Sequence, residues 1–75
     1  MKLPKVEVKS LQDRCVYIAV DSDTGYAQIV ECRFDPYAKP ARQWDIYELG
    51  WDIPREQSEF SGFWGPIPDF ELEGI

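Results

Sequence analysis

The sequence contains no histidine and only two cysteines, Cys15 and Cys32, among its 75 residues. Histidine is the commonest general base and the commonest ligand of transition metals, so its absence argues against zinc chemistry and against a cysteine nucleophile. The fourteen Asp and Glu residues form no motif that selects a catalytic pair or a complete calcium loop. We therefore predict a protein that is not an enzyme and that holds no metal or cofactor.

Long apolar runs and clusters of basic residues are missing as well. No segment approaches the roughly 20 apolar residues that span a bilayer, and the first residues carry alternating charge rather than an apolar signal region. We expect a cytoplasmic protein without membrane contact. Because binding to a phosphate backbone depends on clusters of Lys and Arg, we also expect no direct contact with nucleic acid.

The length of the chain predicts one small domain over residues 1–75. The hydrophobic fraction of 44% and the aromatic fraction of 15% are sufficient to order a core. Chains below about 70 to 80 residues commonly need a disulfide, a metal or a partner subunit to supplement that core. Homo-oligomerisation is therefore one structural expectation for this chain.

The net charge of −6 is distributed unevenly along the sequence. Residues 1–42 carry seven Lys and Arg against six Asp and Glu, whereas residues 43–75 carry only Arg55 against eight Asp and Glu. The second part also holds all three tryptophans. Two interpretations stay open: a solvated acidic surface over an aromatic core, or an acidic and aromatic surface that docks on a basic partner.

A β-hairpin over residues 15–34 is the most clearly predicted element. Two segments rich in β-branched and aromatic residues, 15–20 and 26–34, flank the turn sequence Asp-Ser-Asp-Thr-Gly. Gly25 favours a three-residue loop that ends in a left-handed glycine, in which residues whose numbers sum to 48 face each other. This register predicts an apolar core face made of Val16, Ile18, Val20, Val30, Cys32 and Phe34. It also places Cys15 and Cys32 on opposite faces and so predicts no disulfide, in agreement with a reducing compartment.

The remaining segments give weaker patterns. Residues 4–10 alternate apolar and charged side chains and predict an edge strand. Within residues 40–50, Trp44 and Tyr47 lie three apart and Trp51 follows at i+7, which predicts a short helix, with a strand from Trp44 to Trp51 as the alternative. Prolines and glycines in residues 54–68 predict an irregular aromatic loop, and residues 69–73 alternate as an acidic strand or a tail, so we expect residues 54–75 to be loosely ordered.

Together these patterns predict an α+β fold that is mainly β. We expect a three- to four-stranded antiparallel sheet around the hairpin at 15–34, one short helix or additional strand at 40–50 packed on the Val16, Ile18 and Val30 face, and an irregular aromatic C-terminal segment.

The predicted function is that of a small acidic interaction or inhibitor protein, of the kind encoded on phages and other mobile elements, that binds a basic protein surface. Alternatives are a homo-oligomeric structural module, whose acidic half packs on the more neutral half of a neighbour, and a binder of planar or sugar ligands that uses the aromatic loop. The candidate partner-binding residues are Trp44, Trp51, Asp52, Glu56, Glu59, Phe60, Phe63 and Trp64.

Overall fold

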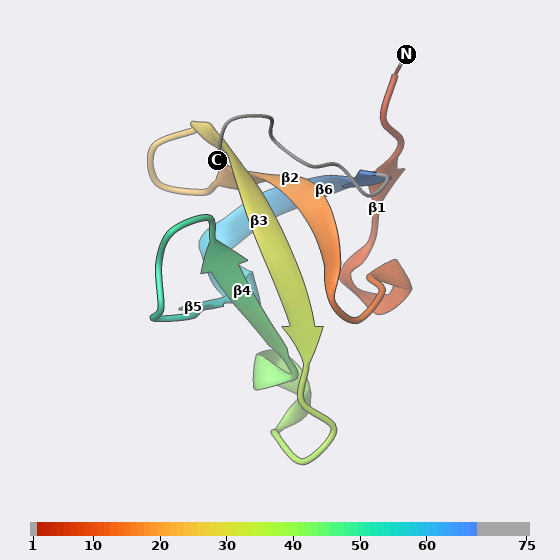
Figure 1. Ribbon diagram of the computed structural model, residues 1–75, viewed down its shortest axis with the longest axis vertical. Coiled ribbons are helices and arrows are strands. Elements are labelled where there is room, and N and C mark those ends of the chain that lie inside the picture. Colours follow the sequence, from red (N-terminus) through yellow and green to blue (C-terminus); the bar gives the residue numbers. More distant parts are fainter. Residues whose placement is uncertain (1, 68–75) are drawn as a thin grey trace.

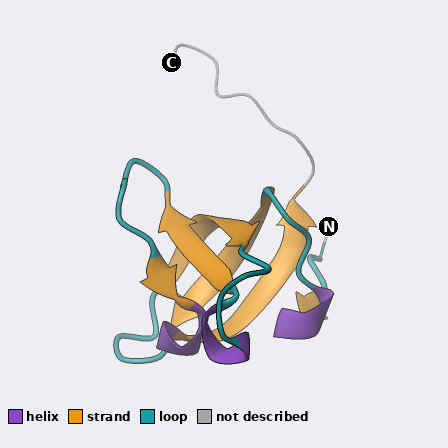
Figure 2. Ribbon diagram, turned by 90° about the horizontal axis from the view of Figure 1, so that it is seen from below, coloured by secondary structure: helices purple, strands orange, loops and turns teal. Residues whose placement is uncertain are grey.

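A computed structural model describes residues 2–67 and consists mainly of one six-stranded antiparallel sheet (Figure 1). The order across the sheet is β1-β6-β2-β3-β4-β5, so the last described strand pairs between the first and the second. The only helical elements in residues 2–67 are three short 3-10 turns, which lie along one side of the sheet (Figure 2). The strands are β1 (Lys5–Val6), β2 (Cys15–Asp21), β3 (Ala27–Phe34), β4 (Trp44–Glu48), β5 (Arg55–Glu56) and β6 (Phe60–Ile67), and the turns are η1 (Val8–Ser10), η2 (Pro40–Arg42) and η3 (Gln57–Glu59).

The mainly β character is confirmed. The edge strand predicted over residues 4–10 forms only as the two-residue strand β1, because Val8–Ser10 is the turn η1. The helix expected at 40–50 is wrong. Only η2 is helical there, and the strand alternative holds as β4, which pairs with β3 from Trp44 to Glu48. Trp44 and Ile46 alternate into the core, so the period of this segment is two. Trp51 does not lie on one face with Trp44, as the predicted helix required, because it follows the end of the strand and is 65% exposed.

The irregular loop expected from residue 54 onward is wrong for the described residues 55–67. This segment forms β5, η3 and the eight-residue strand β6, which raises the sheet from three or four strands to six. Its glycines mark close approaches rather than loops: a Cβ on Gly62 would lie 2.9 Å from the Trp64 ring, and one on Gly65 would lie 3.0 Å from the Tyr17 ring. The acidic strand or tail predicted at 69–73 lies outside the described residues.

The hairpin between β2 and β3 is confirmed, and so is the left-handed glycine at its loop, since Gly25 has φ +74°. The loop, however, has four residues, because the Asp21 N–H donates to the Tyr26 carbonyl at 2.9 Å and the Gly25 N–H donates to the Asp21 carbonyl at 2.9 Å. Pairs such as Ile18 with Ile29 therefore have numbers that sum to 47 rather than 48.

This slip by one residue reverses which side of β2 lies in the core. Tyr17 and Ala19 are fully buried, whereas Val16, Ile18 and Val20 lie half-buried on the opposite face. The predicted core face was thus wrong for β2 and for Phe34, which is largely exposed, but right for two residues of β3. The core comprises Leu11, Tyr17, Ala19, Val30, Cys32, Trp44, Ile46, Phe60 and Phe63.

The two cysteines are direct partners in this register, so the argument that placed them on opposite faces was wrong. Both are nevertheless free thiols in the structure. Burial raises the pKa of the Cys32 thiol to about 12, so Cys32 stays protonated near neutral pH and lacks the thiolate that reacts with oxidants.

Gly65 is the glycine on which the packing of β6 depends most. We expect Gly65→Ala to destabilise the protein by about 3 kcal/mol, because its φ of +142° suits only glycine and its new Cβ would press on Tyr17. Gly25→Ala is the matched control: its φ is also positive, but a Cβ there meets open space, so the loss is about 1 kcal/mol. Urea unfolding measures both, and equal losses would contradict this account of β6.

Candidate functional site

Arg55 of β5 holds together three other segments of the chain. Its guanidinium donates to Asp21 at the end of β2 at 2.5 Å, to Glu48 at the end of β4 at 2.7 Å, and to Glu59 of η3 at 3.2 Å. The same group lies over the Phe60 ring, 4.5 Å from its centroid. One side chain therefore fixes both the hairpin loop and the segment that leads into β6.

Asp21 is the one buried charged residue in the described part of the chain. The hydrogen bond from Arg55 lowers the pKa of its carboxyl, and the N–H groups of Asp23 and Thr24, which donate to it at 2.8 and 3.2 Å, lower that pKa further. The hydrogen bond to Glu48 is the largest cause that raises the pKa of Arg55. Both groups therefore stay charged at neutral pH, and Asp21 closes the hairpin loop as well as binding Arg55.

The chain between β4 and β5 forms a loop over residues 49–54 whose two ends are held. At one end the Leu49 N–H donates to the Ile29 carbonyl at 3.4 Å, and at the other end Arg55 contacts Glu48. Between them the apolar side chains of Leu49, Trp51 and Ile53 are 53%, 65% and 74% exposed. Large apolar side chains on a held loop are typical of protein-binding surfaces.

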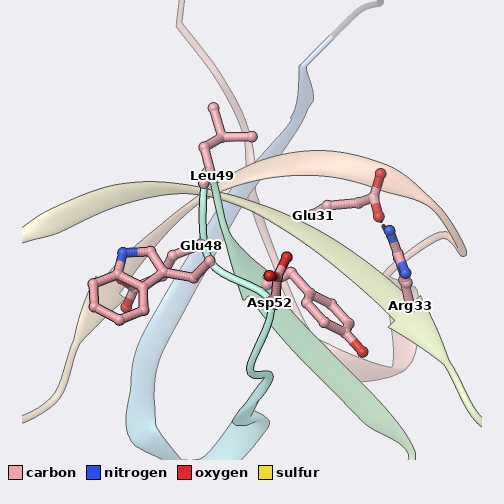
Figure 3. Close-up of a pocket in the computed structure, with 8 residues that line it drawn as sticks. Glu31, Arg33, Glu48, Leu49 and Asp52 are labelled. Atoms are coloured by element: carbon pink, nitrogen blue, oxygen red, sulfur yellow. Dashed lines mark hydrogen bonds and ion pairs between the residues drawn. The ribbon is translucent and has the colours of Figure 1, made fainter.

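Trp51 lies between two hollows of the surface. The first, of about 340 Å³, is shown in Figure 3 and opens between this loop and the outward face of β3 and β4. The second, of about 310 Å³, lies between Trp51, Ile53 and Arg55. The lining of the first consists of Glu31, Arg33, Tyr47, Glu48, Leu49, Gly50, Trp51 and Asp52.

Charges in the first hollow are largely compensated. Arg33 forms an ion pair with Glu31 and lies over the Tyr47 ring, 4.5 Å from its centroid. The hydrogen bond to Glu31 raises the pKa of Arg33. Asp52, by contrast, has no ion-pair partner among residues 2–67.

The structure distributes the predicted aromatic site residues over three places. Trp44, Phe60 and Phe63 lie in the core, where they stabilise the sheet rather than face solvent. Trp64 is half-buried on the outward face of β6, with the Lys5 ammonium 5.4 Å from its ring centroid. Trp51 alone of this set is exposed, so the predicted aromatic residues do not form one platform on which a planar or sugar ligand could stack.

The predicted acidic site residues are also separated. Glu56 forms an ion pair with Arg42 at 3.0 Å, and Glu59 accepts hydrogen bonds from Arg55 and from the Glu56 N–H. These two carboxylates cap η3 in a capping box. Only Asp52 lies beside Trp51 in the exposed loop.

The sequence analysis missed Leu49 and Ile53 as candidate surface residues. The signal that could have found them is the alternation of apolar residues in Leu-Gly-Trp-Asp-Ile-Pro, a segment in which Gly50 and Pro54 favour a loop. The predicted helix at 40–50 obscured this alternation, because it placed Trp51 on the same helix face as Trp44.

Comparisons with protein-family models, with curated proteins and with solved structures find no match for this chain. Among residues 2–67 no three His, Cys, Asp or Glu side chains come together in an arrangement that could hold a metal ion. The same part of the chain has no helix with the length and apolarity to cross a membrane.

The lowered pKa of Asp21 makes part of the stability dependent on pH. We expect Asp21→Asn to be less stable than the unchanged protein at neutral pH, because it loses the ionic contact with Arg55. This difference should narrow as the pH falls below about 4, the pKa of Asp in an unfolded chain, because the unfolded carboxyl then takes up a proton that the native carboxyl, whose pKa is lowered, does not yet bind.

Urea unfolding at pH 7, 5 and 3 measures this dependence. Asp23→Asn is the control, because Asp23 lies in the same loop and has no ion pair among the described residues. A difference between Asp21→Asn and the unchanged protein that stays constant down to pH 3 would contradict the assignment.

Proposed function

We propose that this chain is a small non-catalytic module that binds another protein through the loop at 49–53, with Trp51 and Ile53 as the central contacts. The observation that carries the proposal is the exposure of these two large side chains on a loop whose ends are held by the sheet and by Arg55. Trp is among the residues that contribute most at protein interfaces, because it buries a large area and loses few rotatable bonds.

Preorganisation supports this surface. Gly50, with φ +85°, turns the chain directly after β4, and the Trp51 N–H donates to the Glu48 carbonyl at 3.0 Å. A loop already ordered in this way loses less entropy on binding than a free one.

The partner we propose is a protein with basic residues around an apolar centre. Asp52 lies between the two apolar contacts, and the chain as a whole carries a net charge of −6. Charges at the rim of such an interface mainly accelerate association and weaken with salt. In its narrower form, the proposal is that this chain inhibits its partner and originates from a phage or another mobile element.

A small planar ligand is the second candidate, and the two hollows beside Trp51 favour it. This form of the proposal uses Trp51 and Tyr47 rather than the buried Phe60 and Phe63. If this second candidate is right, a compound of low molecular mass should quench the tryptophan fluorescence, and no protein partner should be recovered from lysate.

The test begins with recovery of partners from lysate by the tagged protein and its variants. We expect Trp51→Ala and Ile53→Ala each to lose a partner that the unchanged protein retains at low salt, and to weaken its purified complex at least about tenfold. Tyr37→Ala is the matched control, because Tyr37 is 96% exposed on a different loop and its removal should change nothing.

Raising the salt concentration should weaken the complex less than removing Trp51 does, because we expect apolar contact to contribute more than charge. A purified complex that binds Trp51→Ala and Ile53→Ala as tightly as the unchanged protein contradicts the proposed surface.

A further inference from the structure

The outward face of the sheet carries one continuous row of side chains across five strands or their extensions. Lys5 is paired with Trp64, Trp64 with Ile18, and Ile18 with Ile29. The backbone bond from Leu49 to Ile29 continues the row toward the end of β4. Directly opposed residues of a sheet project from the same face, so these five side chains lie side by side.

The middle of this row is apolar although it faces away from the core. Ile18 and Trp64 are half-buried, and Ile29 is 40% exposed. Val16 and Val20 flank Ile18 on the same strand, whose other face already buries Tyr17 and Ala19.

A strand that is apolar on both faces is typical of a sheet covered on both sides. No outward side chain of β2 or β3 belongs to the buried core of the described residues. The row therefore has the composition of an interface but lacks a second layer within residues 2–67.

The two ends of the row carry opposite charges. Lys5 stands at one end beside Trp64, and Asp52 lies beside Leu49 at the other. Neither has an ion-pair partner within residues 2–67. Ile18 is the central position, so a two-fold axis through it exchanges the basic and the acidic end.

We infer that this row is a self-association surface that pairs with a second copy of the chain around a two-fold axis near Ile18. In this arrangement Lys5 of each copy faces Asp52 of the partner subunit, and Trp64 packs on Ile29 of the partner subunit. A two-fold interface requires such self-complementarity, and opposite charges at the two ends of one apolar row provide it. The contact uses Leu49 and Asp52 of the loop at 49–53 but not Trp51 or Ile53, so it leaves free the two central contacts proposed for another protein.

A row of five side chains buries less area than the interface of a permanent dimer. We therefore expect weak association, with a dissociation constant of about 10 to 500 μM. Sedimentation of the full chain from about 10 μM to about 1 mM at low salt measures it. We expect Ile29→Glu to abolish the dimer, because it places two carboxylates against the partner's apolar surface. Trp51→Ala should leave it unchanged, which separates this inference from the proposed function.

A charge exchange supplies the decisive test and does not depend on the folding of one variant. Lys5→Glu alone and Asp52→Lys alone should each weaken the dimer about five- to tenfold, because each puts like charges at both ends of the row. An equal mixture of the two variants restores opposite charges at both ends, so it should form a mixed dimer about as tight as the original. A monomer at about 1 mM, or a mixture no tighter than either variant alone, would overturn the inference and leave the face to a different protein.

Discussion

The contact between Arg55 and Asp21 is the interaction on which the arrangement of this small sheet depends. One oxygen of Asp21 accepts the two N–H groups that close the hairpin loop, and the other accepts from Arg55, which is 34 positions further along the chain. The guanidinium also reaches Glu48 and Glu59, so three carboxylates from three segments share one cation. This sharing offsets the repulsion among these three carboxylates.

Both proposed surfaces follow from this organisation. Arg55 holds the end of the loop at 49–54, which leaves Trp51 and Ile53 no place in the core and presents them to solvent. Asp21 fixes a four-residue hairpin loop, and that loop sets the register in which Val16, Ile18 and Val20 face outward. A core built on the inward face alone is small, which agrees with the tendency of short chains to gain stability by association.

The hairpin and its left-handed glycine could be predicted from the sequence, because β-branched runs and a glycine-terminated turn act locally. The register could not be predicted, since it depends on one additional loop residue, and β2 is apolar on both faces and so fits either register. β6 was missed because Gly62, Gly65 and Pro66 are typical of loops, whereas here the two glycines admit the rings of Trp64 and Tyr17. Of the predicted site residues, Trp51 and Asp52 could be placed together from their sequence alone; the burial of Trp44, Phe60 and Phe63 depends on pairing between distant strands.

The charge count from the sequence was limited in the same way, because it could not show which charges pair. The sum over residues 43–75 predicted an acidic surface, but ion pairs with Arg42 and Arg55 occupy Glu48, Glu56 and Glu59. The most direct test of this account is a double-mutant cycle on unfolding with Asp21→Asn, Arg55→Met and the combined variant. If the contact organises the sheet, the combined variant loses clearly less stability than the sum of the two single losses. Losses that simply add would contradict the central place given to this contact.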